Sequence, residues 1–185
     1  MAEGKEIWCQ LFSEPSAGSD VAGLRSKAVQ NGDKWIVNGQ KVWTSGAHFA
    51  DFGILVVRHD PNIEKHKGLT FFFVDMKSPG IEVKPIKQIT GGSSFNEVYF
   101  TDVEIPESQR LGEIGDGWKV AITTLMNERL AVGDADGADV EDAFRWAKKQ
   151  DNLGEPLLNN SAARESIADW YCEKSGLKNT KLRTM

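Results

Sequence analysis

The sequence predicts an α+β protein, in which an antiparallel β-sandwich or barrel is followed by α-helices of an incomplete bundle. Short apolar segments, separated by Gly, Pro and Asn turns, fill the first two thirds of the 185 residues. Beyond a glycine-rich loop at residues 112–117, apolar residues recur at helical spacing instead. This change of period places the strands first and the helices last.

Seven strands are expected in the first part of the chain, at residues 7–12, 24–29, 34–37, 53–58, 68–74, 81–86 and 97–105. Asn31-Gly32-Asp33 favours a hairpin between the second and third strands, and Asn38-Gly39 predicts another turn directly after the third. The uninterrupted apolar runs of the fourth and fifth strands are typical of strands that are buried on both faces. The sixth strand alternates between apolar and polar residues, which predicts one solvated face.

Three helices are expected in the last part of the chain. The first carries an apolar stripe from Trp118 through Leu125 to Arg129 and has Asp116 as its N-cap. The second covers residues 140–149, with acidic residues early and basic residues late, as the helix dipole favours. The third begins at Glu155-Pro156. Each helix is apolar on one side, so we expect additional helices or another chain to cover these stripes.

Composition and charge argue against several classes of function. A net charge of −5 without a basic stripe disfavours nucleic-acid binding, and no apolar run approaches the length of a membrane span. The polar N-terminus lacks the apolar core of a signal peptide. Cys9 and Cys172 lie far apart, which predicts buried, unpaired thiols and a cytoplasmic location. His48, His59 and His66 have no metal-ligand spacing, so no metal site is expected.

A loop of small residues at positions 14–20, Glu-Pro-Ser-Ala-Gly-Ser-Asp, follows the first apolar segment. Its backbone N–H groups, two hydroxyls and small side chains suit the close approach of a flat, phosphorylated cofactor. An ordinary Gly/Pro turn between two strands is the alternative. A second segment at positions 38–46, Asn-Gly-Gln-Lys-Val-Trp-Thr-Ser-Gly, follows later in the chain, and the two segments together favour the cofactor interpretation.

The chain resembles the acyl-CoA dehydrogenases, flavoenzymes that desaturate acyl-CoA thioesters between Cα and Cβ. Five segments in register carry the resemblance, at residues 12–20, 35–45, 95–103, 115–118 and 127–130. The family has an N-terminal helical domain, a middle β domain and a C-terminal helical bundle. The resemblance implies that residues 1–114 form the middle β domain, which binds FAD and acyl-CoA, and that residues 115–185 begin the bundle. The chain is therefore expected to be a fragment.

The resemblance also implies a set of residues that contact FAD: Gln10, Phe12, Ser13, Gly18, Ser19, Trp43, Thr44 and Ser45. Phe12 and Ser13 would place backbone and hydroxyl groups near the polar edge of the flavin ring. Trp43 would flank the isoalloxazine, and a neighbouring hydroxyl would bond near N5. The residues implied to contact the acyl-CoA are Ser19, Asn127 and Arg129. Two alternatives stay open: Trp43 as a core aromatic residue, and Arg129 as a partner in an intrahelical ion pair.

Glu128 is the candidate catalytic base. Most members of the family take this carboxylate from later in the bundle. A minority, including isovaleryl-CoA dehydrogenases, place it on the first bundle helix, directly before the arginine that Arg129 matches. A carboxylate at this position would lose water to bound substrate, which favours its action as a base. The alternatives are a structural glutamate here and a base from later in the family's bundle.

The implied function is FAD-dependent acyl-CoA dehydrogenation, in which a carboxylate removes the α-proton and a hydride leaves Cβ for flavin N5. An acyl-CoA oxidase-like flavoenzyme and a non-catalytic FAD- or acyl-CoA-binding subunit of a heteromeric complex are the alternatives. The expected partners are an acyl-CoA substrate, an electron-transfer flavoprotein or similar acceptor, and other chains in a homo- or hetero-oligomer. The acyl chain is left open, because its pocket belongs mostly to helical regions that are absent here.

Overall fold

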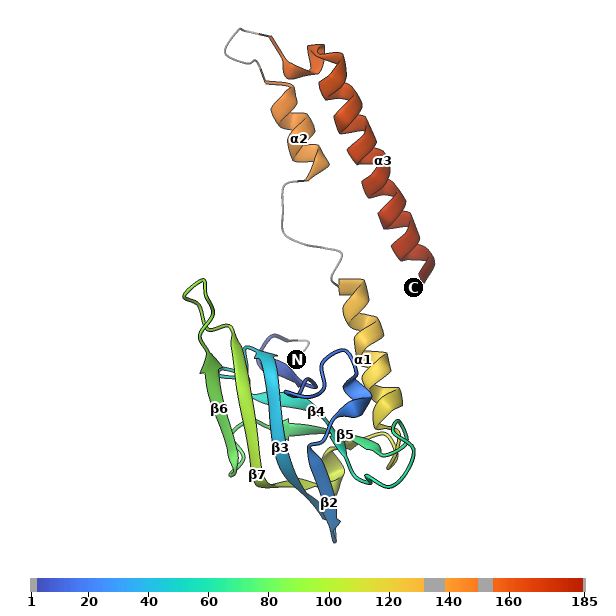
Figure 1. Cartoon of the computed structure of the whole chain (residues 1–185). Coiled ribbons are helices and arrows are strands. Elements are labelled where there is room, and N and C mark those ends of the chain that lie inside the picture. The colour runs from blue at the N-terminus through green and yellow to red at the C-terminus, as the bar shows by residue number, and fades with distance from the viewer. Residues whose placement is uncertain (1–2, 132–138, 150–154, 185) are drawn as a thin grey trace. The chain divides into compact units, whose positions relative to one another are not determined.

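The structure is a computed structural model that describes residues 3–131, 139–149 and 155–184. The chain divides into two compact units, residues 1–125 and residues 126–185. The first unit contains the sheet and the beginning of helix α1 (Gly117–Ala131), and the second contains the end of α1 and two more helices. This arrangement confirms the predicted α+β class, with strands first and helices last (Figure 1).

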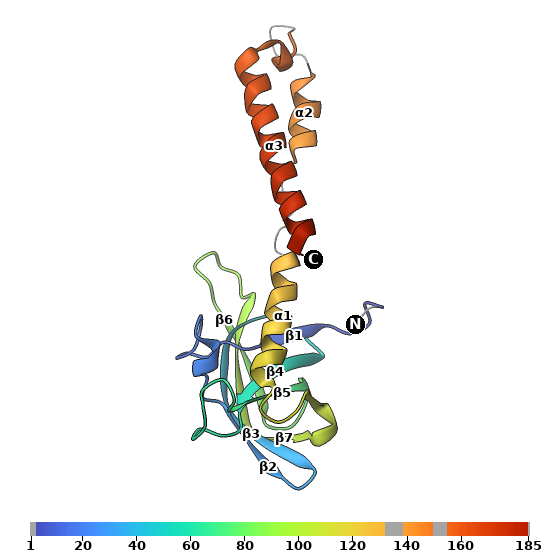
Figure 2. The ribbon, with the colours of Figure 1, turned by 90° about the vertical axis from the view of Figure 1, so that its right-hand side faces the viewer.

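Eight strands form one sheet: β1 (Trp8–Leu11), β2 (Lys27–Asn31), β3 (Lys34–Ser45), β4 (Phe52–Arg58), β5 (Leu69–Asp75), β6 (Ile81–Ile86), β7 (Phe95–Pro106) and β8 (Arg110–Leu111). Their order is β6-β7-β3-β2-β4-β5-β8, with β1 paired to β4. Most neighbours are antiparallel, as predicted, but β4 pairs in parallel with β1 and with β2. The sheet curves without closing, so the barrel form of the prediction is wrong (Figure 2).

The core lies on both faces of β4 and β5, which confirms that these strands are buried on both sides. Neighbouring residues of a strand point to opposite faces. Phe72 packs against Trp35 with ring centroids 5.4 Å apart, whereas Phe71 packs against Phe12 at 5.5 Å. Ala121 of α1 is buried in the same apolar cluster as Phe12 and Phe71. The helix begins very close to β5, since a Cβ on Gly117 would lie 2.6 Å from the backbone of Leu69.

The two Asn-Gly signals have different outcomes. Asn31-Gly32 forms the predicted hairpin, in which Asn31 pairs with Lys34 and Gly32 has a φ of +65°. The turn predicted at Asn38-Gly39 is wrong, because β3 continues to Ser45 with a register shift between Val37 and Gly39. A Cβ on Gly39 would lie 2.2 Å from the Oγ of Ser26. The glycine therefore permits a close approach within the sheet rather than a reversal of the chain.

The second unit contains α2 (Val140–Ala147), the short turn η3 (Leu157–Asn159) and α3 (Ser161–Thr184). Asp139 caps α2 and forms a capping box with Asp142. The prediction that the third helix begins at Glu155-Pro156 is wrong, because Pro156 is extended and Asn160 provides the cap instead. The Asn160 Oδ1 accepts a hydrogen bond from the Ala162 N–H at 2.9 Å.

Two further expectations concern the cysteines and the membrane. Cys9 is buried, and burial raises the pKa of its thiol to about 12, whereas Cys172 is exposed. The prediction of buried thiols is therefore correct for Cys9 and wrong for Cys172, which lies on the surface of α3. Among the helices that the structure describes, none has both the length and the apolar character needed to cross a membrane.

Candidate functional site

Two of the segments singled out in the sequence lie side by side in the first unit. Residues 12–14, which follow β1, contact residues 41–45, which end β3; we call these two segments the β1–β3 corner. The Val42 N–H donates to the Ser13 carbonyl at 2.8 Å, and the Lys41 Nζ donates to the Phe12 carbonyl at 3.1 Å. Bonds from two successive residues of β3 thus hold the backbone of two successive residues after β1.

A β-bulge in β3 makes this contact possible. The register of β3 against β7 shifts between Lys41 and Thr44, so the Val42 N–H is directed to Ser13. Trp43 has a φ of +61°, an unusual conformation for a bulky residue that costs about 1–3 kcal/mol. Its side chain is 59% exposed and meets the ring of Phe95 edge-on at 6.2 Å. An exposed aromatic ring on a strained backbone indicates a binding role, and it excludes Trp43 as a core residue.

Thr44, the residue after Trp43, is buried and carries a polar group without a partner in the described part of the chain. It is 2% exposed, and its hydroxyl oxygen has no hydrogen-bond partner among the described residues. Its carbonyl accepts from the Asn96 Nδ2 at 2.9 Å, and the Asn96 Oδ1 faces the His48 Nδ1 at 3.2 Å. A buried hydroxyl without a partner costs about 1–3 kcal/mol. The chain itself encloses this hydroxyl, so Thr44 faces the interior, whereas Trp43 and Ser45 on either side of it are exposed.

The other predicted cofactor residues differ in what they can offer. The side chain of Phe12 is 3% exposed and belongs to the core, so only its backbone is able to face a ligand. Ser13 is half-buried, and Gln10 is half-buried in β1. Ser45 is exposed.

The loop that follows the β1–β3 corner carries Gly18 and Ser19. Both residues are exposed, and a Cβ on Gly18 would meet no atom within 4 Å. No crowding within the chain therefore requires a glycine at this position. The open space above Gly18 is what the approach of a ligand to the main chain needs.

The predicted base and two of the three predicted substrate residues belong to α1. Asn127 and Glu128 are exposed and lie in the second unit. Arg129 lies in the same helix, but its side chain is outside the part of the structure that is described. The alternative role of Arg129, in an intrahelical ion pair, therefore also lies outside the part of the structure that is described. The roles of Asn127, Glu128 and Arg129 stay predictions.

The sequence-based reasoning missed a buried ion pair at the β1–β3 corner. The Lys41 Nζ lies 2.8 Å from the Glu14 Oε1, and the two side chains are 0% and 4% exposed. The Glu14 carboxylate also accepts from the backbone N–H of Arg25 at 2.6 Å and of Ser26 at 3.0 Å. The alternation of β3 could have indicated that Lys41 is buried, because Lys41 is an even number of residues from the buried Trp35 and side chains at such positions point to the same face of a strand.

Burial and pairing act in opposite directions on the pKa values of these two groups. Burial lowers the pKa of Lys41 to about 8, against the opposing effect of the Glu14 charge. Burial also pushes the pKa of Glu14 up. The charge and hydrogen bond of Lys41, together with the hydrogen bonds from Arg25 and Ser26, outweigh that effect and hold the pKa of Glu14 below its usual 4.5. A carboxylate with this set of donors remains ionised at neutral pH.

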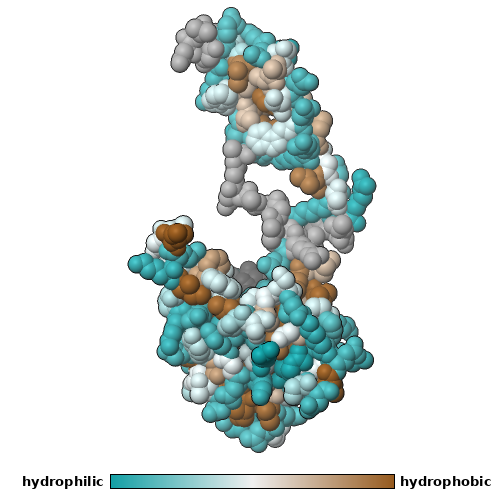
Figure 3. Space-filling view, viewed as in Figure 1, coloured by the Kyte–Doolittle hydropathy of each residue, from teal (hydrophilic) through white to brown (hydrophobic). Residues whose placement is uncertain are grey.

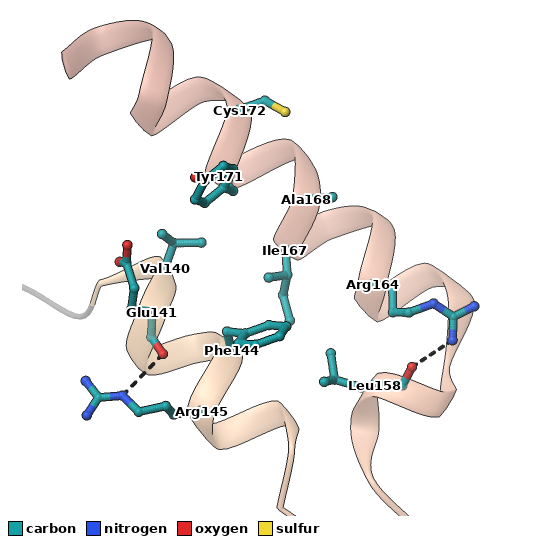
Figure 4. Close-up of a pocket in the computed structure, with 10 residues that line it drawn as sticks. All are labelled: Val140, Glu141, Phe144, Arg145, Leu158, Arg164, Ile167, Ala168, Tyr171 and Cys172. Atoms are coloured by element: carbon teal, nitrogen blue, oxygen red, sulfur yellow. Dashed lines mark hydrogen bonds between the residues drawn. The ribbon is translucent and has the colours of Figure 1, made fainter. Parts of the chain in front are cut away.

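Elsewhere, the second unit has an apolar hollow of about 850 Å³ between α2 and α3 (Figure 4). Its apolar lining includes Val140, Phe144, Leu158, Ile167 and Tyr171. In the space-filling view, brown side chains border it in the helical part (Figure 3). Over the described ranges, no group of three or more His, Cys, Asp and Glu residues is placed to hold a metal ion. The hollow is suited to apolar contacts rather than to catalysis.

Comparison with known proteins identifies the family. A family model described as "Acyl-CoA dehydrogenase, middle domain" matches residues 9–103, and another described as "Acyl-CoA dehydrogenase, C-terminal domain" matches residues 115–185. The chain belongs to the acyl-CoA dehydrogenase family, whose members are flavoproteins. This family membership agrees with a ligand-binding role for the β1–β3 corner.

Individual relatives are longer than this chain. It is 48% identical over 164 residues to the acyl-CoA dehydrogenase FadE34 of Mycobacterium tuberculosis, covering 84% of this chain and 23% of that protein. The solved "Tcur3481-Tcur3483 steroid ACAD" is similar with a TM-score of 0.80 and 32% identity, covering 98% of this chain and 46% of that chain. The ChsE4-ChsE5 complex from Mycobacterium tuberculosis has a TM-score of 0.77 and 29% identity, with 98% and 48% covered. The chain thus spans less than half the length of these relatives.

Proposed function

We propose that this chain is part of an FAD-dependent acyl-CoA dehydrogenase and supplies much of its flavin-binding surface. The observation that carries the proposal is the exposed indole of Trp43 on a strained backbone, with the exposed Ser45 two residues further along β3. Membership of a flavoprotein family gives this surface a fitting ligand. The division into a middle β domain at residues 1–114 and the start of a helical bundle at residues 115–185 belongs to this proposal, as does a cytoplasmic location.

FAD, when bound, would supply the electron acceptor for desaturation of the thioester. In our proposal the Trp43 indole covers one side of the ring, and the exposed hydroxyl of Ser45 donates to one of its polar atoms. The backbone and hydroxyl of Ser13 contact the polar edge of the ring. The open, exposed loop at Gly18 and Ser19 lets the main chain approach the cofactor. Gln10, Phe12 and Thr44 lie beside these residues in the sequence and complete the predicted set.

Glu128 is proposed as the base that takes the α-proton of the acyl-CoA. Its carboxylate is exposed, so a thioester is able to reach it and displace its water. Asn127 and Arg129, its neighbours in α1, are proposed to hold the substrate. Ser19, in the first unit, is also a predicted contact of the acyl-CoA.

An absorption spectrum tests the proposal directly. The purified 185-residue chain would be mixed with FAD and then, without oxygen, with a panel of acyl-CoAs. A protein-bound flavin spectrum that bleaches on addition of an acyl-CoA is the expected result. Bound flavin that no acyl-CoA bleaches would favour the non-catalytic subunit, and bleaching followed by rapid reoxidation in air would favour the oxidase. A chain that retains no flavin would contradict the proposal for this polypeptide.

Replacement of Glu128 tests the base. Glu128→Gln is expected to slow flavin reduction by acyl-CoA about 10²–10⁴-fold, because the proton acceptor is lost while the shape is kept. Glu165→Gln, at an exposed position of α3, is the matched control and should leave the rate unchanged. The measurement is stopped-flow absorbance in a form of the protein that reduces its flavin. Reduction at the normal rate in Glu128→Gln would remove this residue from the mechanism.

Partners are proposed by analogy with the relatives. Two solved relatives, the ChsE4-ChsE5 complex and Tcur3481-Tcur3483, are each named for two proteins. We therefore propose that this chain works in an oligomer with further copies or with a second acyl-CoA dehydrogenase chain, and passes electrons to an electron-transfer flavoprotein or similar acceptor. Because Tcur3481-Tcur3483 is named a steroid ACAD, a steroid-derived acyl-CoA belongs in the panel of substrates.

A further inference from the structure

The buried ion pair between Glu14 and Lys41 needs an explanation that stability alone does not provide. The two side chains are 4% and 0% exposed, and they meet at 2.8 Å. Removing two charges from water is costly, and replacement of such a pair by apolar residues of similar volume is often neutral or stabilising. The pair lies within the β1–β3 corner, next to the buried Phe12.

The contacts of the pair join three separate segments of the backbone. The Lys41 Nζ donates to the Phe12 carbonyl at 3.1 Å, just after β1 ends. The Glu14 carboxylate accepts from the N–H groups of Arg25 and Ser26, directly before β2. An apolar side chain at position 41 would leave the Phe12 carbonyl without this donor, so the lysine does what an apolar replacement could not do.

A hydrogen bond between main-chain atoms lies directly beside the contact of Lys41 with Phe12. The Val42 N–H donates to the Ser13 carbonyl at 2.8 Å, one residue along each segment from the Lys41 contact. Two successive carbonyls, those of Phe12 and Ser13, are thus held by two successive residues of β3. The next residues of that strand are Trp43 and Thr44, the strained indole and the unpaired hydroxyl. The candidate flavin site thus has two walls, the backbone of Phe12 and Ser13 and the end of β3 at Trp43, and the pair fixes one relative to the other.

We propose that Glu14 and Lys41 are positioning residues, whose ion pair holds the backbone of Phe12 and Ser13 against β3 so that the two walls of the flavin site keep their spacing. Neither residue touches the ring in this proposal; both act through the carbonyls and N–H groups that they bind. The inference rests on the proposed function for the identity of the ligand. The positioning of the backbone itself does not depend on the ligand.

The test compares three variants of the 185-residue chain. Lys41→Met removes the ammonium, and the double variant Glu14→Gln with Lys41→Met removes both charges, so that no unpaired charge remains buried. Lys34→Met is the matched control, since Lys34 lies in the same strand but forms an exposed ion pair with Glu104 at 2.6 Å. Two readouts are used: amide hydrogen exchange without FAD, and the dissociation constant for FAD from flavin fluorescence.

Without FAD, we expect exchange of the Val42 amide to be at least about tenfold faster in the double variant. The amides of β4 and β5 should change by less than about twofold, which shows that the fold is retained. We expect the dissociation constant for FAD to rise at least about tenfold, while Lys34→Met stays within about twofold of the wild type. A merely structural pair would instead give FAD binding that recovers in the double variant together with thermal stability.

Different results would contradict the positioning role of the ion pair and the proposed function of the chain. Unchanged exchange at Val42, or normal FAD affinity in the double variant, would overturn the positioning role of the pair. A wild-type chain that binds no FAD would count against the proposed function, and the Val42 exchange would still decide whether the pair positions the backbone. If Lys41→Met alone does not fold, the double variant, which leaves no unpaired charge, provides both readouts.

Discussion

The β-rich first unit and the helical second unit differ in how much apolar surface each buries by itself. Phe71 and Phe72 of β5 are 1% and 0% exposed, and side chains from several strands close around them. Within the described part of the second unit, the buried apolar residues are Val140 and Ala147, while the larger Trp146 is 64% exposed. A sheet pairs its strands and packs both faces within one segment of chain, whereas each helix buries only a stripe and needs a neighbour for it.

This difference explains where the candidate site is well defined. In the first unit, a packed core supports a strained residue, an unpaired hydroxyl and a buried ion pair within a few residues of one another. Such features persist only where the surroundings hold them in place. In the second unit, the hollow between α2 and α3 is lined mostly by apolar side chains, and the guanidinium groups of its lining residues Arg145 and Arg164 bond to the backbone carbonyls of Glu141 and Leu158 (Figure 4). The candidate cofactor residues therefore lie in the β unit, whereas the proposed base Glu128 lies in the helical unit, which buries less apolar surface.

Truncation of one phenylalanine in each unit is expected to show the largest difference in stability between the two units. Phe72→Ala should lower the free energy of unfolding by about 3–5 kcal/mol, because it leaves a cavity beside Trp35 in a closed core. Phe144→Ala should cost less than about 1 kcal/mol, since that ring is 42% exposed. Urea unfolding followed by circular dichroism measures both. Equal costs would mean that the hollow beside Phe144 is filled in solution.

Loss of the buried carboxylate is expected to have the next largest effect. Glu14→Gln should lower the free energy of unfolding by about 3 kcal/mol at pH 7, because it leaves Lys41 buried without a counter-charge. The folded-state pKa of Glu14 lies below its usual 4.5, so the wild type has its full advantage above that value. The advantage is lost as pH falls through the lowered folded-state pKa. Urea midpoints of both proteins at a series of acidic pH values measure this, and a constant difference would contradict the ion pair.

Exposed tryptophans in the two units should respond to glycine with opposite signs. Trp43→Gly is expected to raise the free energy of unfolding by about 1 kcal/mol, because glycine accepts the φ of +61° without strain. Trp170→Gly, in the interior of α3, should lower it by about 1 kcal/mol or more, since glycine is a poor helix former. Thermal unfolding gives both values. Destabilisation by Trp43→Gly would show that the indole packs more than its 59% exposure indicates.

The smallest effect is expected from an exposed ion pair of the helical unit. Lys174 donates to Asp139 and, at 2.8 Å, to the Glu141 Oε2, but all three side chains are at least 40% exposed. Lys174→Met should leave the urea midpoint unchanged within error, because water and salt screen exposed charges. A measurable loss that disappears at high salt would show that this network does stabilise the unit. The contrast with Glu14 and Lys41 separates buried from exposed pairs within one chain.

The regular parts of the fold were predictable because local patterns decide them. The hairpin at Asn31-Gly32 and the apolar runs of β4 and β5 follow from turn residues and hydrophobic period. The prediction at Asn38-Gly39 was wrong because the same dipeptide suits a bulge, and the close approach of Ser26 decides between the two. The start of the third helix was misplaced because Asn160, rather than Glu155, supplies the cap.

The sequence by itself determined the order of strands and helices, the family, and the segments at 12–20 and 35–45 that form the candidate site. Those properties depend on neighbours along the chain. Only the tertiary structure decided that Lys41 reaches Glu14 and the Phe12 carbonyl, and that the Thr44 hydroxyl is buried without a partner. The physical reason is that burial and pairing depend on which distant segments meet, and here a bulge of β3 against β7 brings the backbone after β1 within reach.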